Sequence, residues 1–286
     1  MLGVIGFIVL LGSIFGGYVA SNGQMLHLWH PFEILIIFGG ATGAVIIANP
    51  GSVLKNILRH LKYVFAGNGF NRAYFEELMH LLCALFNMAR KQGGKKALEE
   101  HIEKPEHSSL FTKYPKVLAT QSVTEFLTGN LRLMLEDSIH THELEALIEE
   151  EMHNYEKEIS RSAEALTSMG DALPGFGIMA AVLGIVITMG SLGGPAQELG
   201  MKIGAALVGT FMGVFLGYGV VGPMAGAIGH SIHAEIKALE LIKNALSSHH
   251  GGTPPEVSVE TGRKILFSED RPTFEEMEQM LSESRE

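Results

Sequence analysis

The sequence contains one cysteine, one tryptophan and very few charges within its apolar stretches. A lone thiol excludes an internal disulfide, and Cys83, in the apolar run LMHLLCALF, is expected to be a buried apolar side chain. A formal net charge of −10, with no concentrated basic face apparent along the sequence, argues against nucleic acid as a partner. These absences leave the apolar segments as the informative part of the chain.

Motifs of enzymes and of metal sites are also missing. His140 and His142, like His249 and His250, stand as pairs with neither a nearby cysteine nor an HExxH arrangement, so no metal is expected. The glycines of GFGIMA follow no strand, and neither a phosphate-cradling loop nor a GxSxG nucleophile motif is present. We therefore expect a protein that is not an enzyme and holds no cofactor.

Four apolar segments are long enough to cross a bilayer, which takes about 20 residues. They cover residues 2–20, 33–49, 173–190 and 203–228. Elsewhere apolar residues recur at three- and four-residue spacing, which predicts helices, and one long helix runs toward the third apolar segment. We expect an all-α, polytopic membrane protein with four transmembrane helices and a mostly helical cytoplasmic domain. The expected parts are residues 1–50 (spans 1 and 2), 51–170 (cytoplasmic domain), 171–228 (spans 3 and 4) and 229–286 (cytoplasmic tail).

Lysine and arginine positions predict the orientation of the spans. The turns at 21–31 and 191–201 contain neither residue type, whereas residues 51–170 hold fourteen and the tail after 228 holds six. Positive charge is retained on the cytoplasmic side of a membrane. Both termini and the region 51–170 are therefore expected in the cytoplasm.

Charged side chains are absent from the interior of the predicted spans. Glu33, Asp171, Glu198 and Lys202 lie at segment edges, and Asp171 suits a helix cap. Because ion paths through membranes usually carry ionisable groups, an ion crossing here needs a carboxylate from another polypeptide.

Glycine and proline mark the last two spans. Gly209, Gly213 and Gly217 repeat at four-residue spacing, which leaves one helix face nearly bare. That face serves either close helix packing or a partner helix that slides against it. Pro174 and Pro223 fall on the same half of the membrane and predict a hinge, although Pro174 also suits the first turn of a helix.

A mixed-charge segment lies in the cytoplasmic region, in ARKQGGKKALEE. It contains Arg90, Lys91, Lys95, Lys96 and Glu99. Such a segment is either an ordinary solvated surface or a docking site whose charges select a partner.

Four passages together resemble one family. They are LGSIFGGYVASNG, GDALPGFGIMAAVLGIV, VGTFMGVFLGYGVVGPMA and PPEVSVETGRKILFSEDRPTFEE, and the similarity covers nearly the full length. The chain resembles the A subunits of the bacterial flagellar motor stator, the MotA/PomA family. The more distant ExbB/TolQ energisers of periplasm-spanning partners are the alternative, but they differ in span count and lack this tail.

The resemblance implies a subunit of the bacterial inner membrane, in contact with lipids, that converts ion flux into torque. It implies a pentamer of this chain around a dimer of a B subunit (MotB/PomB-like), whose single span carries the ion-binding aspartate. It also implies contact with the rotor switch protein FliG. No nucleic acid partner is expected.

Functional positions of the family fall on specific residues here. Its two functional prolines correspond to Pro174 and Pro223, and its rotor-facing acidic residue to Glu99. Its rotor-facing arginine corresponds to Lys91, with Arg90 one place earlier, which leaves open which cation meets the rotor because lysine lacks the planar guanidinium.

Ion choice is expected to depend on two further positions. Sodium-type relatives carry a threonine where this chain has Ala181, whereas the span-four threonine, Thr210, is present. Sodium needs several oxygen ligands and a proton needs one acceptor, so the resemblance implies a proton as the transported ion.

Overall fold

The computed structural model describes residues 2–67, 69–91, 93–136, 139–190, 193 and 195–283. Helices form all the regular secondary structure within these ranges. The all-α fold class and the four long apolar helices predicted from the sequence are thus confirmed.

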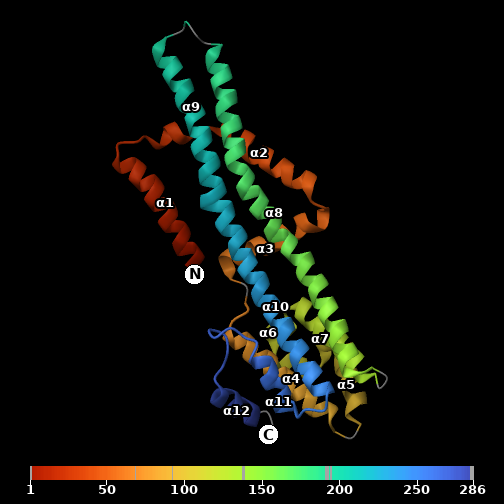
Figure 1. Ribbon diagram of the computed structural model, residues 1–286. Coiled ribbons are helices and arrows are strands. Elements are labelled where there is room, and N and C mark those ends of the chain that lie inside the picture. Colours follow the sequence, from red (N-terminus) through yellow and green to blue (C-terminus); the bar gives the residue numbers. More distant parts are fainter. Residues whose placement is uncertain are drawn as a thin grey trace. The chain divides into compact units, whose positions relative to one another are not determined.

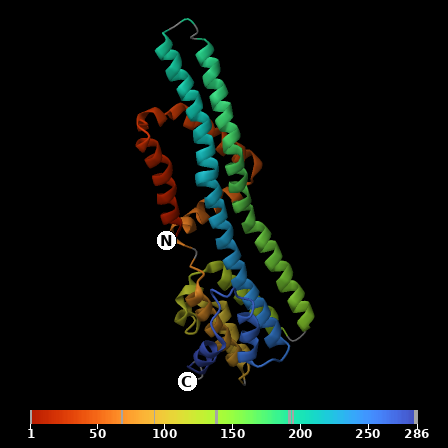
Figure 2. The same cartoon turned by 60° about the vertical axis from the view of Figure 1, so that its left-hand side comes forward.

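The elements follow in chain order, and Figures 1 and 2 show them from two directions. They are α1 (Leu2–Ala20), η1 (Met25–Leu28), α2 (Pro31–Ala48), α3 (Gly51–Ala66), α4 (Arg72–Ala89), α5 (Gly94–Glu103), η2 (Pro105–His107), η3 (Phe111–Lys113), α6 (Pro115–Leu118), α7 (Gln121–Leu135), α8 (Thr141–Met189), α9 (Ala196–Val214), η4 (Phe215–Val221), α10 (Gly222–His250), α11 (Pro255–Arg263) and α12 (Phe274–Glu283).

The chain divides into two compact units. Unit 1 comprises Met1–Gly67 and Ile159–His230, and unit 2 comprises Asn68–Glu158 and Ser231–Glu286. The domain boundaries expected from the sequence were placed at the ends of the membrane spans. In the structure, α3 and residues 159–170, which were expected in the cytoplasmic domain, belong to the same compact unit as the spans. Both α8 and α10 have residues in each unit.

The third apolar segment is the end of a much longer helix. The 49 residues of α8 form one unbroken helix, which confirms the predicted continuity and corresponds to a length of about 74 Å at 1.5 Å per residue. Unit 1 leaves many large apolar side chains exposed along α1, α2, α8 and α9, including Ile8, Ile47 and Ile187. Exposed apolar faces on helices of spanning length are suited to lipid or to other membrane helices.

Unit 2, by contrast, has a core like that of a water-soluble protein. Phe75, Leu78, Phe86, Leu98 and Leu127 are fully buried there. Cys83 is buried among the same helices, as expected. The two C-terminal histidines of α10 have structural contacts: His249 stacks on Phe86 with ring centroids 4.2 Å apart, and His250 bonds the Ile139 carbonyl.

A buried carboxylate links three helices of unit 2. Glu235 of α10 accepts hydrogen bonds from the Ser122 hydroxyl of α7 and the Tyr155 hydroxyl of α8, both at 2.5 Å and both to Oε1. Glu235 is only 8% exposed. A buried carboxylate is costly unless donors compensate it, so the two hydroxyls fix how α7, α8 and α10 pack.

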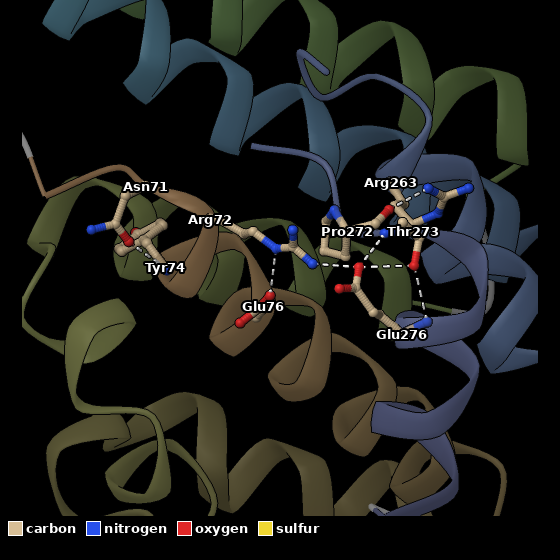
Figure 3. Close-up of polar contacts among 8 residues, drawn as sticks. All are labelled: Asn71, Arg72, Tyr74, Glu76, Arg263, Pro272, Thr273 and Glu276. Atoms are coloured by element: carbon tan, nitrogen blue, oxygen red, sulfur yellow. Dashed lines mark hydrogen bonds and ion pairs between the residues drawn. The ribbon is translucent and has the colours of Figure 1, made fainter. Parts of the chain in front are cut away.

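The C-terminal helix α12 is held against α4 by a second polar cluster (Figure 3). Arg72 pairs with Glu76 on its own helix, 3.0 Å away, and with Glu276 on α12. The Glu276 carboxylate also accepts from the backbone N–H and the hydroxyl of Thr273, which forms a capping box at the start of α12. Met277, one residue on, is buried.

We expect Tyr155→Phe to lower the stability of unit 2 because it removes one of the two donors to Glu235. Loss of a hydrogen bond to a buried charged group costs about 1–3 kcal/mol, which corresponds to a drop of a few degrees in the melting temperature. Thermal unfolding of the detergent-solubilised full chain measures it. Tyr18→Phe is the matched control, since that hydroxyl is exposed and makes only a 3.5 Å contact. Equal melting temperatures for wild type and Tyr155→Phe would show that the Glu235 cluster does not stabilise the unit.

Acidification is expected to loosen α12. The backbone N–H and hydroxyl of Thr273, and then Arg72, lower the pKa of Glu276. A depressed carboxyl pKa contributes stability above the ordinary glutamate value, and that contribution is lost as the pH falls through the lower folded value. Hydrogen exchange of α12, corrected for intrinsic rates, should therefore accelerate below about pH 4.5 in the wild type. In Glu276→Gln, exchange of α12 should be faster already at neutral pH. Exchange that is the same in both proteins at every pH would contradict this.

Candidate functional site

The three spaced glycines of the last span lie against α8 of the same chain. A Cβ added to Gly213 would come within 2.7 Å of Gly177 Cα and 2.8 Å of the Leu173 carbonyl oxygen. These atoms belong to backbone, which cannot rotate away as a side chain does. The two helices therefore approach at backbone contact, which only glycine permits at this position.

The close approach continues along the helix pair toward the α8–α9 connection. About one turn from Gly213, a Cβ on Gly209 would meet the Ala180 Cβ and the Ala181 amide nitrogen, each at 3.4 Å. About one turn further, a Cβ on Gly184 would meet the Ala206 Cβ at 3.0 Å. Small residues thus line both sides of the α8–α9 contact, which runs antiparallel (Figures 1 and 2).

Pro174 lies in the interior of α8, not in its first turn, because α8 begins at Thr141. This excludes the first-turn alternative considered from the sequence. A proline inside a helix has no N–H for the carbonyl four residues earlier, which here belongs to Gly170. The Gly170 carbonyl oxygen faces Gly217, where an added Cβ would lie only 2.6 Å from it and 3.0 Å from Pro174 Cδ.

Pro223 is preceded by a π-helical segment. The segment η4 (Phe215–Val221) is wound with wider turns, and the Gly222 N–H donates to the Gly217 carbonyl, five residues earlier. A proline in a regular α-helix clashes with the carbonyl four residues before it, and a π segment relieves such a conflict. The helix is therefore distorted near Pro223, and the distortion is a widening of the turns just before the proline. The proline ring is exposed.

The distortions associated with the two prolines meet at Gly217. Its carbonyl accepts the bond that defines the π segment before Pro223, and its Cα faces the Gly170 carbonyl and the Pro174 ring. From the sequence, Gly217 is assigned only to the glycine repeat, and Gly170 has no expected role. The signal that could have marked Gly170 is its position four residues before Pro174.

Ala181 and Thr210 lie at the same level of the helix pair. Gly209 approaches the Ala181 amide, Thr210 is the next residue, and both Ala181 and Thr210 are half-buried. Glu198 and Lys202, near the start of α9, form an ion pair at 2.8 Å. Asp171 lies inside α8, which begins at Thr141, so it is not the helix cap expected from the sequence. Residues 172–190 and 203–229 contain no acidic, lysine or arginine side chain.

The mixed-charge residues are brought together by the turn between α4 and α5. Arg90 and Lys91 follow the end of α4, and Lys95, Lys96 and Glu99 lie on the first turns of α5; all five are exposed. Gly93 in the turn has φ +76°, a conformation that favours glycine. These charges therefore form one exposed group, here called the α4–α5 charge cluster.

Comparison with known proteins identifies the family. Residues 4–93 match the motility protein A N-terminal family, and residues 118–241 match the MotA/TolQ/ExbB proton channel family. Motility protein A of Escherichia coli is 39% identical over 98% of this chain and 94% of the relative. Chemotaxis protein LafT of Vibrio parahaemolyticus is 38% identical over 98% of both chains.

Solved structures with the same fold include a C. jejuni MotAB structure, with TM-score 0.77, 23% identity and coverage of 95% of this chain and 98% of that one. The flagellar MotAB stator complex from Bacillus subtilis has TM-score 0.67 and 26% identity, covering 90% and 92% of the two chains. The matched families are motility and proton channel proteins and not enzyme families. With four helices of spanning length, the chain is a multi-pass inner-membrane protein that belongs to the motility protein A family, the stator subunits of the bacterial flagellar motor.

Proposed function

We propose that the chain is the A subunit of a proton-driven stator, in which a B subunit supplies the ion-binding aspartate. The observation that carries the proposal is the Pro174–Gly217–η4 contact on a helix pair whose residues 172–190 and 203–229 contain no acidic, lysine or arginine side chain. These stretches have two sites of altered helix geometry at one level but no carboxylate to hold an ion. The titrating carboxylate then belongs to the partner.

The assembly follows from the same reasoning. The Bacillus subtilis structure is that of a MotAB stator complex, and a B partner with one acidic span fits beside residues 172–190 and 203–229, which lack acidic, lysine and arginine side chains. We propose five copies of this chain around a B dimer, with lipid on the remaining exposed apolar faces. The lysine and arginine distribution supports cytoplasmic termini and a cytoplasmic unit 2.

Torque in this proposal starts with bending at the two prolines. Neutralising the partner's aspartate changes the charge beside α8 and η4, and the helices respond where the regular α-helical hydrogen-bond pattern is interrupted, at Gly170 and in η4. Both α8 and α10 extend without a break from this level into residues of unit 2. In this proposal, a change in the direction of either helix is passed along it to its residues in unit 2.

The α4–α5 charge cluster is the proposed contact with the rotor protein FliG. Its five charges are exposed around the turn between α4 and α5, which suits recognition of a charged surface and fast association with it. Arg90 and Lys91 are adjacent, so either cation can take the position of the family's rotor-facing arginine. Glu99 supplies the acidic contact.

We expect Pro174→Ala and Pro223→Ala to abolish swimming while membrane level and co-purification with the B subunit persist. Each restores a backbone donor and lets the helix close into regular α-geometry. Swimming speed and complex yield measure the two effects separately. Normal swimming in both variants would rule out the hinge.

We expect Gly217→Ala to impair motility because its Cβ would meet the Gly170 carbonyl oxygen at 2.6 Å. Gly200→Ala in α9 is the matched control, since nothing lies within 4 Å of a Cβ there. In the double variant Pro174→Ala/Gly217→Ala, residue 174 regains an N–H that draws the Gly170 carbonyl back toward the helix axis. Thermal stability should therefore fall by less than the sum of the single losses. Additive losses would show that the two residues do not interact.

Ion choice gives a separate prediction. At constant ionic strength, replacing sodium with potassium should leave wild-type swimming unchanged, whereas a protonophore should stop it. Ala181 carries a methyl group where a threonine would add a hydroxyl, at the level of the helix pair where Gly209 and Thr210 lie. Ala181→Thr alone should not make swimming depend on sodium, because several oxygen ligands are required. Wild-type swimming that stops without external sodium would contradict proton use.

A further inference from the structure

The helix α3 begins three residues after the end of α2 and was not identified from the sequence. One of its faces is fixed within unit 1, where Val53, Ile57 and His60 are buried. His60 Nδ1 lies 2.8 Å from the Ser162 hydroxyl of α8, which in turn donates to the Ile159 carbonyl at 2.7 Å. The Val64 carbonyl lies 3.3 Å from the position of a Cβ on Gly3 of α1. The orientation of α3 about its axis is therefore set.

The opposite face carries three cations around a leucine. Lys55, Leu58, Arg59 and Lys62 follow the spacing i, i+3, i+4 and i+7, which places them on one side of a helix. All four are exposed, and Leu58 is 73% exposed. This set of residues is called the α3 cationic face.

The α3 cationic face has no acidic neighbour in the sequence. Residues 34–75 contain neither aspartate nor glutamate, although the chain as a whole has a net charge of −10. Arg59 donates to Asn56 of its own helix at 3.2 Å, and Lys62 lies 5.5 Å from the centroid of the Tyr63 ring. Among the described residues no acidic group pairs with Lys55, Arg59 or Lys62.

We propose that the α3 cationic face binds the headgroups of anionic phospholipids in the cytoplasmic leaflet. The proposal rests on the topology proposed above, which places the end of α2 at that leaflet. A helix that starts three residues beyond a span stays close to the membrane surface. Basic side chains with an apolar residue among them match the composition of interfacial helices, whose cations meet anionic headgroups while the apolar residue enters the acyl boundary.

A protein partner matches this face less well. Leu58 stands alone among cations, and the half-buried Leu54 and Leu61 continue the apolar flank along the same helix. Such a flank beside cations suits the boundary between the hydrocarbon and the charged headgroups of a bilayer.

Binding of lipid at the α3 cationic face would also anchor α8. The His60–Ser162 bond joins α3 to α8 twelve residues before Pro174, so the leaflet would hold the part of α8 that precedes the proposed hinge.

The test places a fluorophore on the α3 cationic face. Leu58→Cys, in a Cys83→Ala background, is labelled in the full chain co-purified with its B subunit. The complex is placed in nanodiscs of phosphatidylcholine alone or with about 30% phosphatidylglycerol, an anionic lipid. Quenching by acrylamide, which is neutral, reports how exposed the label is to water. We expect the quenching constant to fall roughly twofold with phosphatidylglycerol, and the difference to shrink at high salt.

Charge variants show whether the three cations cause the difference. Lys55→Gln/Arg59→Gln/Lys62→Gln should abolish the effect of phosphatidylglycerol on quenching. The control Lys104→Gln/Lys113→Gln/Lys157→Gln removes the same charge from exposed positions of unit 2 and should retain the effect. If the first triple variant does not assemble, Lys55→Gln and Arg59→Gln singly should each reduce it.

Three results would overturn the proposal. Equal quenching in both lipid compositions would show that anionic headgroups are not bound. An effect that persists in the triple variant, or in both single variants, would show that these cations are not responsible. A label already protected in detergent without phospholipid would show that another subunit covers the face. The test uses neither ion flux nor rotation, so failure of the stator mechanism would appear in the motility experiments and leave this result unchanged.

Discussion

The approach of Gly217 to the Gly170 carbonyl and the Pro174 ring is the constraint on which the rest of the site depends. Pro174 leaves the Gly170 carbonyl without its usual donor, and only a residue lacking Cβ fits opposite it. The carbonyl of the same Gly217 takes the five-residue bond that widens the helix before Pro223. A single residue thus joins two places where the regular α-helical hydrogen-bond pattern is interrupted. Such places bend at lower cost than a regular helix does.

Other contacts hold the helices on either side of the Gly217–Pro174 contact in place. Small residues from Gly184 to Gly170 keep α8 and the last span close over several turns, so the two helices act together. The Glu235 cluster and the capping box at Thr273 organise unit 2, which presents the α4–α5 charge cluster. The α3 cationic face, where lipid binding is proposed, lies on a helix bonded to α8 at Ser162. A hinge transmits a displacement when the segments before and after it are held by fixed contacts.

Much of the fold follows from patterns that a sequence shows directly. Membrane spans can be predicted because a run of about 20 apolar residues has few structural roles other than crossing a bilayer. Helices can be predicted because apolar residues recur every three or four positions. The glycine repeat and both prolines were also identified. The pairing of Gly217 with Gly170 was not, because it joins residues on different helices whose relative register only packing sets. The cationic face of α3 was missed for a related reason: Lys55, Arg59 and Lys62 are dispersed in the sequence and gather only on the helix.

In the proposed mechanism, α8 bends at Pro174 when the partner's carboxylate changes charge. Nitroxide labels at Glu158→Cys and Ile187→Cys, both exposed on α8 on either side of Pro174, measure that bend by pulsed electron resonance. The complex would be formed with labelled subunits diluted among unlabelled ones, and with the B subunit's aspartate present or replaced by asparagine. If α8 bends at Pro174, the distance distribution shifts between the two states and Pro174→Ala removes the shift. An identical distribution in both states would contradict it.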